Sequence, residues 1–522
     1  MGTTHGDGLK ERHGRERNGL YTLSGKRMLK IDCRYVGVLV GLAAAWPTLF
    51  SPLVDDVYIH ARIVDMYSHG LGFVYNSGQV YKASSSTGFV LVLTAISAWT
   101  GDVVHSVRLV EFVVVFATIQ IYCWYCHVAG VRWQTSLVGW SVLPYVLVAA
   151  YLGMETPIVC LLLMAGVLAQ HLRLYGVLVG VFALTVLFRL EALVLVALFV
   201  VYGIVNNLSL RYRLGILLLT ASIFVVDWAL FGGFIPQGLL VKPLVYNFPL
   251  MDSFRNALAF GHGGWGVLAG GPFLILFMLR LVLWLKYPNK MIDFWAVYFA
   301  FSFAIYCGWL FGRTIIFEWY YCLLTFPFML YVLLEGMSSM PSEVFRVRRL
   351  SIVVLAMFFV MGSMDLVGIF IVRNNPLNRV ARYLQIGTVL YDVCPTCSLA
   401  TSETGAVGYS FKGTIHDAFG LGDPEAVRYH PLDVPRQRVD YSIGAIAPKY
   451  VMDKEPDFIV TMPTFSAALR ASQAVAAYHG YDCRFDRSQG TVWGNVKIEV
   501  YSKEELPDVA LAAMDCSKAP PR

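Results

Sequence analysis

Two adjacent carboxylates, Asp55 and Asp56, come directly after the first long apolar run of the chain. A carboxylate within hydrogen-bond reach of a hydroxyl group can remove its proton, so either aspartate could act as a general base. Either aspartate, or Ser51, could instead cap the amphipathic helix expected to follow, because the free amides of a first helical turn bind an oxygen atom. One carboxylate is enough for a cap. We therefore expect one aspartate to accept a proton and its neighbour to cap the helix or position the acceptor.

Four basic residues near the ends of apolar runs could bind an anion: Arg62, Arg189, Lys242 and Arg313. Arg62 lies two helical turns beyond Asp55, which places both on one helix face. Singly, each cation could be an interfacial residue whose stem lies along apolar surface. Together on one side of a membrane they indicate an anionic ligand, and a lipid phosphate is the natural candidate.

Two further acids, Glu155 and Glu191, flank neighbouring apolar runs close to Arg189. They could simply form an ion pair with this arginine. A buried pair of this kind would also orient a phosphate-binding guanidinium, so the structural and functional interpretations are compatible.

Composition places these residues in a polytopic α-helical membrane protein. The 522 residues are 57% hydrophobic and only 15% charged, well outside the range of soluble domains. The net charge of +6 arises largely from the first 34 residues and from short breaks between apolar runs. Because that distribution is a topology signal, it indicates no nucleic-acid partner.

About eleven apolar runs could each cross a ~30 Å hydrocarbon core as a helix of ~20 residues. They are approximately 36–52, 107–128, 134–151, 156–170, 173–188, 190–206, 213–231, 266–285, 292–311, 317–336 and 350–371. A further run, Thr87 to Trp99, is too short to cross and suits a re-entrant or interfacial segment. Counting this run as a crossing would move most basic loops outside, against the positive-inside rule.

This topology divides the chain into three parts. Residues 1–34 form a basic cytoplasmic tail, followed by an uncleaved first span. Residues 35–373 form the membrane domain, whose first external loop is 52–86. Residues 374–522 form an external α/β domain, in which 458–461 and 496–501 are predicted strands and 465–479 a predicted helix.

Cysteine spacing gives a weaker indication. The C-terminal part holds four cysteines in a compartment expected to be oxidising, namely Cys394, Cys397, Cys483 and Cys516. Cys394 and Cys397 could form a structural disulfide or remain free thiols. No second CxxC pair or nearby histidine pair supports a zinc site.

Several segments resemble one family of membrane enzymes. Val54-Asp-Asp-Val-Tyr-Ile-His-Ala-Arg62, Gly70-Leu-Gly-Phe-Val-Tyr-Asn-Ser-Gly78 and Ser84-Ser-Ser-Thr-Gly88 resemble the first external loop of GT-C glycosyltransferases, close to the bacterial arabinofuranosyltransferase-like branch. Gly153-Met-Glu-Thr156, Arg189-Leu-Glu191 and Pro236 with Lys242 are similar to later motifs. In the tail, Glu403-Thr-Gly-Ala-Val-Gly-Tyr409 and Ile415-His-Asp-Ala-Phe-Gly-Leu-Gly-Asp-Pro424 match the small external domain of such enzymes. His60 departs from the pattern, which has an aromatic or small residue there, and Leu190 stands where an Arg-Pro-Glu pattern has proline.

The resemblance implies inverting transfer of a sugar, such as arabinofuranose, from a polyprenyl-phosphate donor to an external glycan, lipid or protein. Asp55 or Asp56 would be the base and Tyr58 a supporting residue, as would Glu155 and Glu191. Lys242 and Arg189 would bind the donor phosphate, with Arg62 and Arg313 as further candidates. No cofactor is expected, and a divalent cation is not favoured because Lys and Arg can neutralise one phosphate. The enzyme would lie in the bacterial inner membrane.

The alternative class is a flippase or transporter of lipid-linked sugars. Transporters tend to contain internal repeats with matched broken helices. No such repeat is visible, and the polar residues gather on one face of the membrane. No nucleotide-binding loop of the Walker type is present, so the sequence gives no support to an ATP-driven pump.

Overall fold

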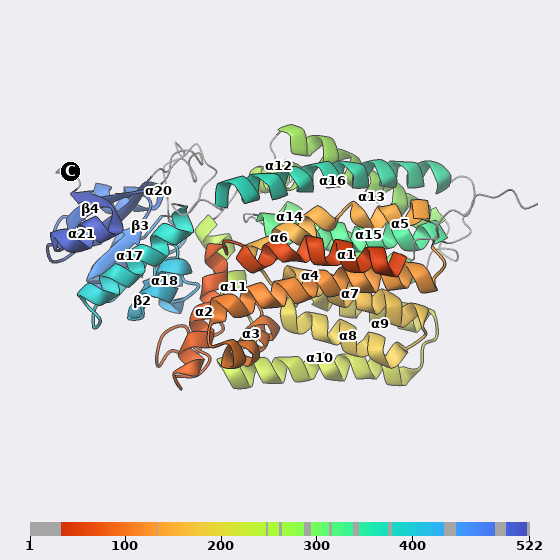
Figure 1. Ribbon diagram of the computed structural model, residues 1–522, viewed down its shortest axis with the longest axis horizontal. Coiled ribbons are helices and arrows are strands. Elements are labelled where there is room, and N and C mark those ends of the chain that lie inside the picture. Colours follow the sequence, from red (N-terminus) through yellow and green to blue (C-terminus); the bar gives the residue numbers. More distant parts are fainter. Residues whose placement is uncertain are drawn as a thin grey trace, which may run out of the picture.

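The computed structural model describes residues 33–131, 133–246, 249–259, 264–286, 294–312, 316–337, 344–373, 378–432, 445–485 and 497–518. The predicted basic tail therefore lies almost entirely outside the described residues. Within them, a bundle of long helices carries a smaller domain with a β-sheet at one end (Figure 1). We call the end of the bundle that meets this domain the domain-facing end.

The bundle is built from apolar helices because its segments are hydrophobic on nearly every side. Its helices are α1 Cys33–Ala45, α4 Val103–Val128, α5 Trp133–Trp140, α6 Leu143–Leu152, α7 Thr156–His171, α8 Tyr175–Phe188, α9 Leu193–Val205, α10 Leu210–Phe231, α13 Gly264–Lys286, α14 Phe294–Phe311, α15 Tyr321–Met337 and α16 Val344–Arg373. The outermost, α10, leaves large side chains such as Leu218 and Trp228 exposed, as expected of a helix facing lipid.

Three helices in the described part of the chain are long and apolar enough to cross a membrane: Val103–Val128, Leu210–Phe231 and Arg349–Ile371. A fourth candidate is the pair Gly37–Phe50 and Asp55–Ser68, which is bent by 74° between its halves. Further apolar helices, among them Thr156–His171 and Tyr175–Phe188, have 10–17 residues. The count of eleven spans therefore stays a prediction.

The loop after the first apolar run contains η1 Trp46–Phe50, α2 Asp55–Ser68 and α3 Thr87–Thr100. Ser86 caps α3 by accepting from the amide of Phe89, and Gly101 ends it with a φ of 72°. With 14 residues, α3 is about 21 Å long at 1.5 Å per residue, which is shorter than a ~30 Å hydrocarbon core. The re-entrant or interfacial segment predicted there stays a prediction.

Other short elements join the long helices. They are η2 Leu190–Ala192, α11 Gln237–Tyr246, α12 Leu250–Ala259 and η4 Glu318–Tyr320. The ion pair between Lys82 and Asp227 fixes the end of the first loop to α10, and the amide of Gln237 donates to the carbonyl of Lys82. These contacts bring α2 and α11 together at the domain-facing end (Figure 1).

The C-terminal domain has one mixed six-stranded sheet of order β2-β1-β3-β5-β4-β6, in which β2, β1 and β3 are parallel and the remaining pairs antiparallel. Its elements are α17 Arg379–Val393, β1 Ser398–Thr401, α18 Ala406–Ser410, β2 Thr414–Asp417, η5 Pro424–Tyr429, α19 Pro448–Lys454, β3 Phe458–Thr461, α20 Pro463–Ala471, β4 His479–Arg484, β5 Lys497–Ser502, α21 Asp508–Met514 and β6 Cys516–Lys518. The strands predicted at 458–461 and 496–501 are confirmed to within a residue at each end. The helix predicted over 465–479 is wrong in extent, because it ends at Ala471 and Gln473 adopts a φ of 58°.

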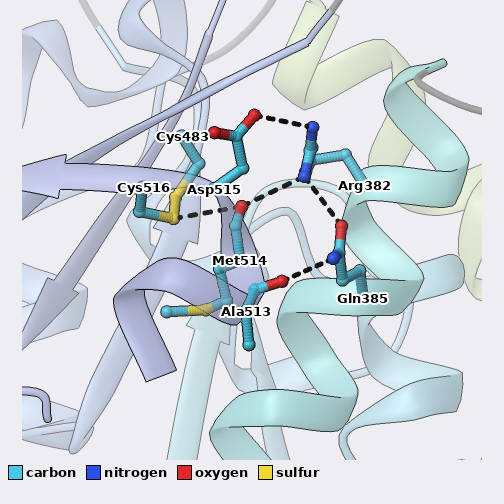
Figure 2. Close-up of a disulfide and its surroundings, with 7 residues drawn as sticks. All are labelled: Arg382, Gln385, Cys483, Ala513, Met514, Asp515 and Cys516. Atoms are coloured by element: carbon cyan, nitrogen blue, oxygen red, sulfur yellow. Dashed lines mark hydrogen bonds and ion pairs between the residues drawn. A yellow bond between two sulfur atoms is a disulfide. The ribbon is translucent and has the colours of Figure 1, made fainter. Parts of the chain in front are cut away.

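Two disulfides lie in this domain. Cys394 is bonded to Cys397, the first of the two predicted alternatives, and Cys483 to Cys516. Figure 2 shows the contacts between α17 and the turn before Cys516. Arg382 donates to the carbonyl of Met514 and forms an ion pair with Asp515. Gln385 donates to the carbonyl of Ala513. The Cys483–Cys516 bond thus anchors the segment on which α17 is docked.

Candidate active site

The helix α2 begins at Asp55 itself, and its N-cap residue is Val54, which provides no side-chain hydrogen bond. The expectation that Ser51, Asp55 or Asp56 caps this helix is therefore wrong. Both aspartates instead lie in the first turn, where the helix dipole still favours negative charge. Their side chains are free to make contacts elsewhere, and those contacts differ.

Asp55 is directed at the C-terminal domain. Its two carboxylate oxygens accept from the amides of Gly405, at 3.1 Å, and Ala406, at 2.8 Å, in the first turn of α18. A Cβ atom on Gly405 would lie 1.8 Å from the carbonyl oxygen of Asp55, so only glycine permits this approach. Asp55 thus caps a helix, but one that lies 350 residues further along the chain.

Burial and the neighbouring Glu403 raise the pKa of Asp55 to about 7, whereas Arg379 and the amide of Ala406 oppose the shift. Glu403 in turn forms an ion pair with Arg379 on α17. Because both oxygens of Asp55 accept from backbone amides of the C-terminal domain, we infer that this residue holds that domain against α2.

Asp56 lies in a pocket between the bundle and α11. Its carboxylate is 30% exposed and lies 3.9 Å from the Nζ atom of Lys242. The ammonium of Lys242 also lies 5.2 Å from the ring centre of Phe317, a cation–π distance. Burial alone would lower the pKa of Lys242, but Tyr320 and Asp56 raise it above its ordinary value, which keeps the residue cationic. A carboxylate and an ammonium group therefore share one accessible site.

Arg189 and two glutamates form the rear of this site. The Arg189 guanidinium donates to Glu155 at 2.6 Å and makes two hydrogen bonds to Glu191. It also lies over the ring of Tyr320, a residue that lines the pocket. The predicted Arg189–Glu155 pair is therefore present, and it is fully buried on the Glu155 side.

Several residues that line the pocket were not among the predicted site residues, including His60, Ser84 and Ser85. His60 lies one helical turn after Asp56, and Ser84 and Ser85 belong to the Ser84–Gly88 segment singled out in the sequence. Spacing within α2 could have placed His60 beside Asp56. The approach of the two serines depends on the path of the loop, for which the sequence carries no signal.

Arg62 and Tyr58 lie away from the pocket. The Arg62 guanidinium is buried and donates to the carbonyls of Tyr75, Gly408 and Gly413. Tyr58 packs against Tyr409, with ring centres 5.5 Å apart. Arg62 does share a helix face with Asp55, as predicted, but this face meets the C-terminal domain. Arg313 lies outside the described residues.

Comparisons with known proteins bear on the fold. No protein-family model and no curated protein matches the chain. Two crystal structures of ArnT from Cupriavidus metallidurans resemble it, each with a TM-score of 0.52. One is bound to undecaprenyl phosphate, is 13% identical, and aligns over 90% of this chain and 98% of ArnT. The other is the apo state, with 12% identity over 90% and 97% of the respective chains.

This likeness covers both the bundle and most of the C-terminal part. The chain therefore shares the fold of ArnT, in which a bundle of apolar helices carries a smaller domain with a β-sheet.

Proposed function

We propose that this protein is a glycosyltransferase that moves a sugar from a polyprenyl-phosphate donor to an acceptor hydroxyl. The observation that carries the proposal is the pocket in which Asp56 and Lys242 lie 3.9 Å apart. The reaction needs both a base for the attacking hydroxyl and a cation for the departing phosphate. The crystallisation of ArnT with undecaprenyl phosphate supports the choice of a lipid carrier for a chain of this fold.

In the proposed reaction, Asp56 accepts the proton of the acceptor hydroxyl while its oxygen attacks the anomeric carbon. The bond between that carbon and the phosphate oxygen breaks, and its electron pair leaves with polyprenyl phosphate. Attack from the face opposite the leaving group inverts the anomeric centre. Lys242 stabilises the charge of the leaving phosphate, and Arg189, held by Glu155 and Glu191, is the second donor proposed to contact it.

The resemblance of the first loop to the arabinofuranosyltransferase-like branch leads us to propose a pentofuranose such as arabinose. The acceptor is a glycan, a lipid or a protein. We place the N-terminus in the cytoplasm and the pocket with the C-terminal domain on the outer side of the bacterial inner membrane, following the basic loops. Lys242 and Arg189 provide charge for one phosphate without an obligatory divalent cation.

The test is transfer of labelled arabinofuranose from synthetic decaprenyl phosphate by the full-length protein in detergent, with and without a chelator. We expect transfer by the wild type in both conditions and loss of transfer by the Asp56→Asn variant. Parallel liposomes report movement of the same lipid across the bilayer. Lipid movement without transfer would identify a flippase instead, and loss of transfer in the chelator would establish a required metal.

A further inference from the structure

His60 lies in the wall of the pocket, held between a serine and a glutamate. Its ring is 3% exposed and packs edge-on against Phe89, with ring centres 5.4 Å apart. Its Nδ1 atom lies 2.8 Å from the Oγ of Ser84, and its Nε2 atom lies 3.8 Å from the Oε2 of Glu155. The first contact is a hydrogen bond, whereas the second is too long to be one.

The hydrogen bonds around Ser84 assign the protons of the ring. The amide of Ser86 donates to the Oγ of Ser84 at 3.0 Å, which leaves the hydroxyl proton free to be donated. The nearer of its two acceptors is Nδ1 of His60, because the carbonyl of Ser86 is 3.1 Å away. If Nδ1 accepts, the neutral ring carries its proton on Nε2, directed toward Glu155. Burial lowers the pKa of His60, which favours this neutral form.

Glu155 faces this ring with an unused oxygen. Its Oε1 atom accepts from Arg189 at 2.6 Å and from Ser85 at 3.3 Å. Its Oε2 atom is buried and has no hydrogen-bond partner among the described residues. Buried polar atoms are almost always paired, so a carboxylate oxygen that the described residues leave unpaired beside a pocket is available to a ligand.

A single hydroxyl oxygen satisfies both groups. Oε2 is covered by protein atoms in this structure, so the two side chains must separate to admit such an oxygen. At about 2.8 Å from each group, it then accepts from Nε2 of His60 and donates its own proton to Oε2 of Glu155. A carboxylate accepts but cannot donate, and the ring nitrogen in this form only donates. A hydroxyl group, which has one proton to give and lone pairs to receive, therefore matches this donor and acceptor pair.

We propose that His60 and Glu155 clamp one hydroxyl of the donor sugar, and that His60 is a specificity-determining residue of the site. The proposal rests on the glycosyltransferase function proposed above. We assign the clamp to the donor sugar, whose phosphate is assigned to Lys242 in the same pocket. Since Asp56, assigned to the acceptor hydroxyl, lines that pocket as well, deoxy analogues of the donor test this choice. The substrate class is a polyprenyl-phosphate sugar with a free hydroxyl at one defined ring position.

The experiment measures kcat/KM for synthetic decaprenyl-phosphate arabinofuranose and its single-deoxy analogues. With the wild type, one analogue should be slower by about 10–100-fold, the effect of a hydrogen bond to a charged group. In His60→Ala the parent sugar should lose a similar factor, and the penalty for that one analogue should shrink toward the values of the others. A role confined to supporting the loop would slow every analogue equally.

Two variants with amide side chains distinguish the role of Nδ1 of His60 from that of Nε2. His60→Gln can place an N–H near the position of Nε2, whereas His60→Asn can reach only the position of Nδ1 and Ser84. We expect Gln to retain more transfer and more discrimination than Asn. His69→Gln, at the exposed end of the same helix, is the matched control and should behave as wild type.

The outcomes are distinguishable. If the wild type transfers arabinofuranose but no analogue shows a penalty that depends on His60, the clamp is wrong while the proposed function stands. The same conclusion follows if Asn outperforms Gln, which would mean that only the Ser84 contact matters. If the wild type transfers nothing, the proposed function fails and the clamp fails with it. Melting temperatures are measured for each variant, and if His60→Ala does not fold, the Gln and Asn pair decides.

Discussion

Two polar clusters are built on the same helix, α2, and they differ in how many of their polar atoms have hydrogen-bond partners within the protein. The docking cluster comprises Asp55 and Arg62 with the loop 403–413 of the C-terminal domain. The pocket cluster comprises Asp56, His60, Glu155, Arg189 and Lys242. In the docking cluster, both Asp55 oxygens accept from amides and Arg62 donates to several carbonyls. In the pocket cluster, Glu155 Oε2 has no hydrogen-bond partner in the described part of the chain, and Asp56 lies 3.9 Å from Lys242.

This difference separates a structural from a chemical role for neighbouring residues of identical type. A polar group whose hydrogen bonds are all made by the protein stabilises the fold and has nothing left for a ligand. A group that is close to its partner but incompletely paired retains capacity for a substrate. Asp55 and Asp56 are adjacent in sequence, yet the first belongs to one kind of cluster and the second to the other.

The largest expected effect is on catalysis. Asp56→Asn should lower kcat for sugar transfer by about 10²–10⁴-fold, the range for removing a general base. Asp55→Asn should change kcat far less, since its side chain contacts the C-terminal domain. Transfer rates of both variants at a saturating donor concentration show which aspartate acts as the base. Equal loss in the two variants would remove the distinction between the clusters.

The next largest expected effect is a loss of folding stability when the docking cluster is changed. Arg62→Met should lower the free energy of unfolding by about 3 kcal/mol, because several buried carbonyls lose their donor. The KM for the donor should stay unchanged in the folded fraction. Thermal melting in detergent measures the loss, with Arg255→Met, an arginine that is 73% exposed, as control. A stable variant with a raised KM would instead return Arg62 to the set of phosphate-binding residues.

Variants of Lys242 test the role of its positive charge in the pocket cluster. Lys242→Met should reduce kcat/KM by about 10–100-fold through loss of a charged hydrogen bond to phosphate. Lys242→Arg should recover part of the loss because it retains the charge. Transfer assays over a range of donor concentrations provide the values. If Met and Arg variants both match the wild type, the phosphate is bound elsewhere.

The last prediction concerns the dependence of stability on pH. In the folded protein the pKa of Asp55 is raised from 3.8 to about 7. Between these values the unfolded chain has released its proton and the folded chain has not, so stability contributed by Asp55 falls as pH rises from about 4 to about 7. Asp55→Asn does not titrate. Its melting temperature should therefore rise relative to that of the wild type between pH 5 and pH 8, and a constant difference would contradict the raised pKa.

The sequence was informative about which residues gather at one end of the membrane domain. Loop charge and the ends of apolar runs brought Asp56, Glu155, Arg189, Glu191 and Lys242 into one candidate set, and the structure places all five near one another. The spacing within α2 also placed Asp55 and Arg62 on a common face. These inferences succeed because helical periodicity and charge at span ends are local properties.

Contacts between residues far apart in the sequence could not be predicted from periodicity and charge. The helix predicted over 465–479 consists mostly of good helix formers, but Ala474 and Val475 turn back to pack on the sheet, and packing overrides propensity. The partners of Asp55 and Arg62 lie about 350 residues away. No local pattern predicts which loop covers a given helix face.

The sequence by itself thus determined a membrane protein with a carboxylate pair beside a set of cations, because hydropathy and charge patterns reflect the bilayer directly. Only the tertiary structure decided that Asp55 docks the C-terminal domain and that Asp56 faces the pocket. The physical reason is that the free energy of a buried carboxylate depends on the atoms that surround it. Here those atoms come from α18 for one aspartate and from α11 for the other.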